Sequence, residues 1–144
     1  MANPSKQTPE NSSQSPPRAT LAQLSEQKQL DFELEFFAAL LGEQPGFIDV
    51  LRAHGNNLTL KGRYEEGMTI DKQLIQLRPA DYLAHYNLAC SYALLKQPEQ
   101  AIRTLRKAVE LGYRDFRYMK QDRDLESIRR DPRFKQILRE FENR

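Results

Sequence analysis

Residues 82–112 read YLAHYNLACSYALLKQPEQAIRTLRKAVELG, and this stretch decides the fold that the sequence predicts. Apolar and small residues recur in it every three or four positions, on both sides of a break at Lys96-Gln97-Pro98. Such spacing places the apolar side chains of a helix on one face, and the proline in the break suits the first turn of a second helix. The stretch therefore predicts a hairpin of two amphipathic helices.

The same pattern occurs one hairpin earlier in the chain. Pro45 and Pro79 lie 34 residues apart, and small or apolar residues recur at this offset. The corresponding pairs are Gly55 with Ala89, Leu58 with Tyr92, Gly67 with Ala101 and Leu74 with Ala108. Small residues allow two helices to cross closely, and larger ones fill the adjoining space. The repeat predicts stacked hairpins, with helices near residues 47–60, 64–77, 81–95 and 98–111 and no β-sheet.

The N-terminal region divides into a polar tail and a helix. Residues 1–20 contain four of the eight prolines and almost no apolar side chains. Such a segment cannot offset the entropy lost on ordering, so we expect a disordered tail. From residue 21 onward the spacing is helical, and a helix over residues 23–42 is expected to face the core through Leu30, Leu34, Phe37 and Leu41.

Beyond Gly112 the repeat gives way to shorter helical pieces. Asp131-Pro132 is typical of a helix start, with aspartate as the N-cap and proline in the first turn. One apolar stripe follows, formed by Phe134, Ile137, Leu138 and Phe141. The sequence therefore predicts an irregular helical cap over residues 116–144.

These features resemble the tetratricopeptide repeat family, whose motif runs roughly W-x2-L-G-x2-Y and continues with A, F, A and P. Residues 86–89 (YNLA) carry the motif best, with Tyr92, Ala101, Leu105 and Ala108 at later signature positions. His85 occupies the aromatic position, and Tyr113 stands where a proline would close the repeat. The resemblance implies an all-α fold, a short right-handed superhelix of helix-turn-helix repeats over residues 21–144. It implies a degenerate repeat at about 21–47, repeats at 48–81 and 82–115, and then the cap.

Composition and motifs argue against an enzyme, a metal site and a membrane protein. Cys90 is the only cysteine and there are two histidines, which leaves too few soft ligands for a closed zinc site. The sequence has no phosphate-binding loop, G-x-S-x-G elbow or H-E-x-x-H motif. We therefore expect no catalytic residue, no cofactor and no small-molecule substrate. Because no membrane span or secretory signal is readable, the expected location is cytoplasmic.

Several reactive or charged side chains have ordinary structural interpretations. His85 and Cys90 are separated by about 500° of helix rotation, so they are not expected to act together as base and nucleophile. His85 fits a packing position, whereas Cys90 is expected to be partly exposed to the groove. The acidic pairs Glu65-Glu66 and Asp122/Asp124 are interpreted as solvated charges at turns and helix ends.

The resemblance also implies a binding groove. Tetratricopeptide domains that capture a C-terminal carboxylate use a basic residue and an Asn on one helix, an Asn on a second and two basic residues on a third. Here the matching positions hold Arg52, Asn56, Asn87 and Arg117, with Gln121 in place of the second basic residue; Tyr86 and Cys90 adjoin them. Guanidinium and amide groups suit carboxylates. We therefore expect a protein-interaction adaptor that binds an acidic or C-terminal partner segment.

Two other functions stay open. A permanent structural or assembly subunit would dock, or self-associate, through the aromatic residues Phe32, Phe36 and Phe47. Nucleic-acid binding is a weaker alternative. It is suggested by the basic C-terminal third, where residues 101–144 hold 13 Lys and Arg against 8 Asp and Glu. The basic side chains of the cap include Arg129, Arg130, Arg133, Lys135 and Arg139. Acidic residues are interspersed among them, so a solvated helical face is expected instead.

Overall fold

The computed structural model describes residues 18–144. Its regular elements are α1 (Leu21–Glu43), α2 (Ile48–Leu60), α3 (Tyr64–Leu77), α4 (Tyr82–Leu94), α5 (Pro98–Leu111), α6 (Phe116–Gln121), the 3-10 helix η1 (Arg123–Ile128) and α7 (Pro132–Phe141). Within these residues there is no strand, and the all-α prediction is confirmed. Residues 1–17, which make up most of the predicted tail, lie outside the described residues.

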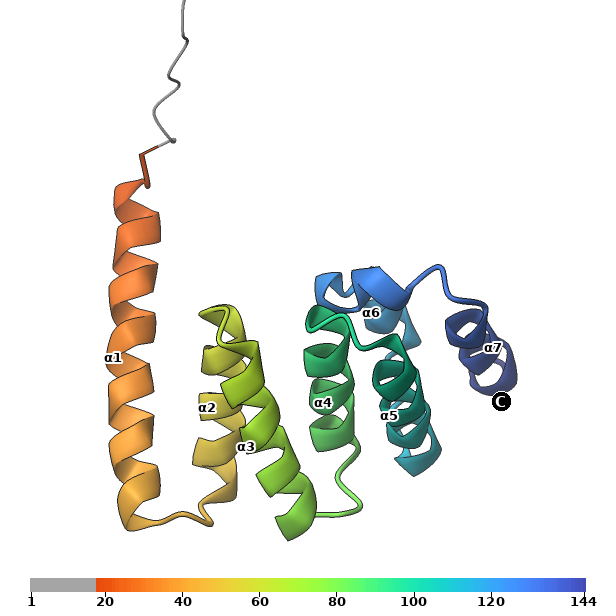
Figure 1. Ribbon diagram of the computed structural model, residues 1–144, viewed down its shortest axis with the longest axis horizontal. Helices are drawn as coiled ribbons and strands as arrows, with labels where there is room; N and C mark the ends of the chain where they lie inside the picture. Colours follow the sequence, from red (N-terminus) through yellow and green to blue (C-terminus); the bar gives the residue numbers. More distant parts are fainter. Residues whose placement is uncertain (1–17) are drawn as a thin grey trace, which may run out of the picture.

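Helices α1 to α5 follow one another in a row, α6 lies near the upper ends of α4 and α5, and α7 stands at the far end (Figure 1). Helices α2 and α3 form one hairpin and α4 and α5 form the next, with ends close to those predicted from the sequence. Each of these helices packs against its neighbour in the chain, and α4 also packs against η1. In such a stack each hairpin buries its apolar face only against the elements beside it.

Small residues bring the two helices of each hairpin close together. A Cβ atom added to Gly67 would lie 3.0 Å from Oγ1 of Thr59 and 3.4 Å from the backbone oxygen of Gly55. In the next hairpin the corresponding residues, Ala89 and Ala101, are completely buried. The predicted correspondence of small residues thus coincides with a close helix crossing in the first hairpin and with complete burial in the second.

The turns inside the hairpins also repeat. Gly62 has a φ angle of 83°, and Lys96, which lies 34 residues later, has a φ angle of 58°. Both values lie in the left-handed region, which favours glycine because a Cβ atom is crowded there. The chain thus reverses direction at the same point of each hairpin, although only the first has the glycine.

The C-terminal segment covers the last hairpin, as the sequence predicted. Asp131 caps α7 by accepting a hydrogen bond from the Arg133 amide at 2.9 Å, and Pro132 lies in the first turn. Phe134 and Ile137 are buried in one core with residues of α4 and α5. The cap therefore completes the core that the hairpin α4–α5 would otherwise expose.

Helix α1 is less buried than its spacing predicts. Thr20 begins the helix in a capping box with Gln23. Of the expected core stripe, Leu34 is buried, whereas Leu30, Phe37 and Leu41 are half-buried. The N-terminal part of α1 extends past the ends of α2 and α3 (Figure 1). Its apolar side chains therefore have fewer neighbours to pack against.

One buried carboxyl group joins the two hairpins. Asp71 of α3 is 3% exposed and accepts a hydrogen bond from the Ser91 hydroxyl of α4 at 3.2 Å. Burial raises the pKa of Asp71 to about 7, although the Ser91 hydrogen bond and the Arg52 charge oppose this shift. Because an unfolded Asp ionises near pH 4, the folded chain holds a proton that the unfolded chain releases between about pH 4 and pH 7.

We expect Asp71→Asn to flatten the pH dependence of stability. The free energy of unfolding of the native chain falls as the pH rises through this interval, because the unfolded state binds fewer protons than the folded state. The amide cannot ionise and can still accept a hydrogen bond from Ser91. The free energy of unfolding of the variant, relative to that of the native chain, should therefore rise with pH, by at most about 4 kcal/mol near pH 8. Urea unfolding at about pH 5 and about pH 8 measures this gain. An equal difference at both pH values would contradict the raised pKa.

The helix crossings generate a second prediction. Ala101→Leu should lower the free energy of unfolding by about 1–3 kcal/mol, because the added atoms would overpack the contact between α4 and α5. Arg103→Leu is the matched control, since Arg103 is exposed on the same helix and should change stability by less than about 0.5 kcal/mol. Thermal unfolding of both variants provides the measurement. Equal effects would show that Ala101 does not occupy a close crossing.

Candidate partner-binding pocket

A pocket of about 690 Å³ opens beside α2 and α4 and extends to the segment between the end of α5 and η1. Two Asn amides, four Tyr rings and four Asp carboxyl groups line it, together with apolar side chains such as Leu60 and Leu83. The lining residues come from both hairpins and from the cap. Because of this arrangement, a ligand in the pocket would contact parts of the chain that are distant in sequence.

Four of the six predicted partner-binding residues line this pocket: Asn56, Tyr86, Asn87 and Cys90. Asn56 is exposed and Asn87 is half-buried, so their amides can reach a ligand. The side chain of Tyr86 is buried and forms part of the pocket wall. The helix register predicted from the repeat therefore places these residues of α2 and α4 on one surface.

Arg52 lies outside this pocket. Its guanidinium group donates a hydrogen bond to the carboxylate of Asp81, the N-cap of α4, and so ties α2 to the next hairpin. Burial raises the pKa of Asp81, but hydrogen bonds from Arg52 and from backbone amides outweigh this and hold it below its ordinary value. Arg52 thus already has an anionic partner within the chain.

The third helix of the expected carboxylate clamp is also placed differently. Arg117 is exposed on α6, and neither Arg117 nor Gln121 lines the pocket. Helix α6 has only six residues and is followed directly by the 3-10 helix η1, so the cap does not continue the geometry of the repeats. The five clamp positions are therefore not gathered around one pocket.

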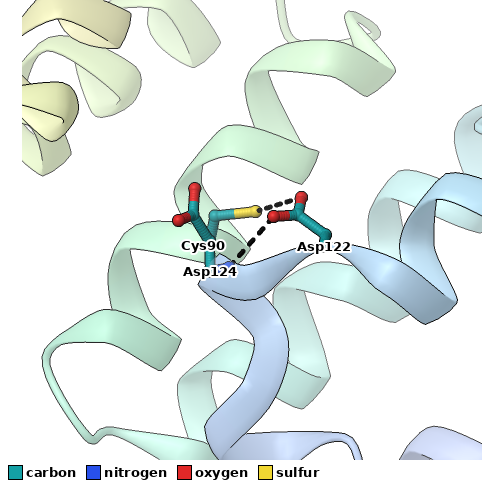
Figure 2. Close-up of side chains that lie close together, drawn as sticks. All are labelled: Cys90, Asp122 and Asp124. Carbon is teal, nitrogen blue, oxygen red and sulfur yellow. Dashed lines mark hydrogen bonds between the residues drawn. The ribbon is translucent and has the colours of Figure 1, made fainter.

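The surroundings of Cys90 differ from the expectation. The side chain is buried, at 5% exposure, and its Sγ atom lies 3.8 Å from Oδ2 of Asp122, toward which it points (Figure 2). Burial, followed by the charges of Asp122 and Asp124, raises the pKa of Cys90 well above its ordinary value. The predicted partial exposure is wrong, and the thiol is not activated as a nucleophile. His85 is buried and hydrogen-bonds the Pro79 backbone oxygen at 2.9 Å, which agrees with a packing role.

Asp122 and Asp124 were expected to be solvated, and this expectation is also wrong. Asp122 is 7% exposed and Asp124 is half-buried. Asp122 accepts hydrogen bonds from the Tyr86 hydroxyl at 2.7 Å and from the Asp124 amide at 3.0 Å. The chain passes from α6 into η1 at this point, and η1 packs against α4. This packing brings the two carboxyl groups to the pocket wall.

These side chains form a compact cluster. Cys90, Asp122 and Asp124 each offer one ligand atom within 4.8 Å of the others, and within residues 18–144 this is the one such group of three that could touch a single metal ion. A thiol binds metal as its thiolate, and the raised pKa of Cys90 opposes that ionisation. The cluster by itself therefore assigns no metal. Its members are too far apart in sequence for any short motif to predict it.

The pocket carries more negative than positive charge. Its ionisable lining residues are Asp115, Asp122, Asp124 and Arg114, together with Asp71, whose raised pKa keeps it partly protonated near neutral pH. Arg114 donates to the backbone oxygens of Val109 and Tyr113 at 2.6 and 2.8 Å. Within residues 18–144, none of the four aspartates forms an ion pair. A carboxylate ligand would therefore meet like charge here.

Two other surfaces relate to the alternative functions. Phe32 and Phe36 of α1 are 62% and 48% exposed, and their rings stack with centroids 6.0 Å apart. Phe47 is 43% exposed, so all three aromatic residues singled out in the sequence are accessible. In the described part of the chain, none of the helices has the length and apolar character needed to span a membrane.

Several basic side chains of the cap are engaged within the chain. Arg133 forms ion pairs with Asp131 at 2.7 Å and with Glu99 at 2.6 Å. Arg129 donates a hydrogen bond to the backbone oxygen of Asp122. These contacts leave fewer free cations for phosphate groups than the residue counts suggest.

Comparisons with known proteins agree with this architecture. A family model described as "Tetratricopeptide repeat" matches residues 82–111. A solved structure, "MamA RS-1 ArsTM double mutant", has a TM-score of 0.58 to this chain, with 19% identity and coverage of 83% of this chain and 71% of that chain. A chloroplastic protein from Arabidopsis thaliana is 31% identical over 91 residues, which represent 61% of this chain.

The matches differ in extent. The chain spans only 27% of the length of the Arabidopsis protein, and the family model covers the hairpin α4–α5. That hairpin is the stretch from which the sequence predicted the fold. Residues 82–111 therefore match a tetratricopeptide repeat, and the chain shares its fold with MamA.

Proposed function

We propose that this protein is an adaptor that binds a segment of a partner protein in the pocket between α2, α4 and the cap. The tetratricopeptide repeat and the MamA-like fold support a protein-interaction scaffold in general terms. Both are typical of non-enzymatic adaptors rather than of enzymes. The cytoplasmic location expected from the sequence stays a prediction.

The observation that carries this proposal is the composition of the pocket across the stack. The pocket is large enough for several side chains and combines amides, tyrosine rings and exposed leucines. Leu60 and Leu83 are 74% and 41% exposed and line the same pocket, so they offer apolar contact to a bound segment. Asn56 and Asn87 flank the same space and offer hydrogen bonds to the backbone of an extended segment.

A second candidate function rests on α1. The exposed, stacked rings of Phe32 and Phe36 lie on a helix that is only partly covered by the rest of the stack. Such a helix face could dock permanently onto a larger assembly or onto a second copy of the chain. This function would need the α1 aromatic residues and would not depend on the pocket.

Two double variants separate these functions. We expect Asn56→Ala with Asn87→Ala to reduce capture of the native partner by about tenfold, because hydrogen bonds to the partner segment are lost. Phe32→Ser with Phe36→Ser should leave that capture unchanged. Affinity capture from the native lysate with quantitative mass spectrometry measures both, and circular dichroism verifies that each variant folds. Loss of the partner only in the phenylalanine variant would instead establish docking through α1.

A further inference from the structure

The four aspartates of the pocket differ from three other aspartates of the chain, which form ion pairs with cationic side chains. Asp31, Asp81 and Asp131 each form an ion pair with a Lys or Arg side chain. Within residues 18–144 the pocket aspartates have no such partner, and Asp71, Asp115 and Asp122 accept hydrogen bonds from neutral groups. Four aspartates without a cationic partner in this range therefore lie around one pocket.

The local geometry concentrates this charge further. Asp122 and Asp124 approach the same point beside Cys90, with one oxygen of each within 4.8 Å of the other (Figure 2). Burial and the neighbouring Asp122 charge raise the pKa of Asp124 above its ordinary value. A cation placed here would relieve the repulsion between the two carboxylates, whereas an anion would increase it.

Aromatic rings border the same space. The Tyr86 and Tyr113 rings stack with centroids 4.1 Å apart, and the Tyr118 ring lies 6.4 Å from that of Tyr86. Tyr82 and Tyr118 are 41% and 54% exposed, so parts of their surfaces are open to a ligand. Tyrosine faces attract guanidinium and ammonium groups, most strongly where water is partly excluded.

From this arrangement we infer that the pocket recognises a basic segment of a partner protein, with an Arg or Lys side chain between Asp122, Asp124 and Tyr118. The inference deepens the proposed function and rests on it. The exposed Leu60 and Leu83 at the pocket favour a peptide over a small free cation, because they offer apolar contact to the residues beside the basic one. The preferred charge is opposite to that of the carboxylate ligand expected from the sequence.

Selection from a displayed library of random peptides tests the inference without a known partner. The intact chain is the bait, and EDTA in the buffer keeps metal ions away from the carboxylates. Enrichment of peptides with Arg or Lys next to an apolar residue is the expected result. Enrichment of acidic peptides, or of free C-terminal carboxylates, would overturn the basic preference and retain the pocket as a peptide site. No enrichment of any class would count against both the inference and the proposed function.

A matched pair of variants then locates the binding site. Asp124→Asn should weaken binding of a selected peptide by about tenfold in fluorescence anisotropy, because one charge-assisted contact is lost. Glu126→Gln removes the same charge two residues away, from an exposed side chain that does not line the pocket, and should change affinity by less than about twofold. Equal effects of the two variants would show only general attraction by negative charge and would overturn the assignment.

The peptide supplies a further control. Replacement of its Arg by citrulline, which keeps the shape and removes the charge, should abolish measurable binding, and higher NaCl concentrations should weaken binding of the original peptide. Spermidine should not compete at concentrations similar to the peptide's dissociation constant. Competition by spermidine at those concentrations would overturn the peptide as the occupant and indicate a site for small cations.

Discussion

The close approach of two helices at small residues is the constraint on which the rest of the structure depends. An added Cβ atom would lie 3.2 Å from the Ile70 side chain at Gly55 and 3.0 Å from the Thr59 side chain at Gly67, so these neighbours would have to shift. The next hairpin places Ala89 and Ala101 at the same offset. Because each hairpin closes in the same way, α2 and α4 present their remaining surfaces on one side of the stack. The pocket is formed where these surfaces meet the cap.

Those parts of the fold that depend on local sequence could be predicted. Helix spacing, the turn at Lys96, the N-cap at Asp131 and the 34-residue offset are all properties of short segments or of their repetition. The extent to which α1 is buried could not be predicted in this way. Its apolar stripe fits a core position, but burial depends on how many neighbouring helices reach it.

The candidate site could be predicted only in part, for the same reason. The repeat register brings Asn56 and Asn87 to the same pocket, because they belong to helices with regular geometry. Arg52 has the residue type and offset of a clamp residue, yet it forms an ion pair with Asp81 at the start of the next hairpin. The Cys90–Asp122 contact depends on where the irregular cap folds back, and no spacing rule specifies that position. The sequence can thus predict on which face of a helix a residue lies, but not which side chain of another element it contacts.

One pocket joins the repeat fold to a binding chemistry. Amide resonances of the intact chain, followed by nuclear magnetic resonance during titration with a selected basic peptide, test this connection most directly. We expect the largest shifts at Asn87, Cys90, Tyr118, Asp122 and Asp124, and small shifts at Phe32 and Phe36. Shifts confined to α1, or spread over the basic face of α7 with none at the pocket residues, would show that the pocket is not the binding site.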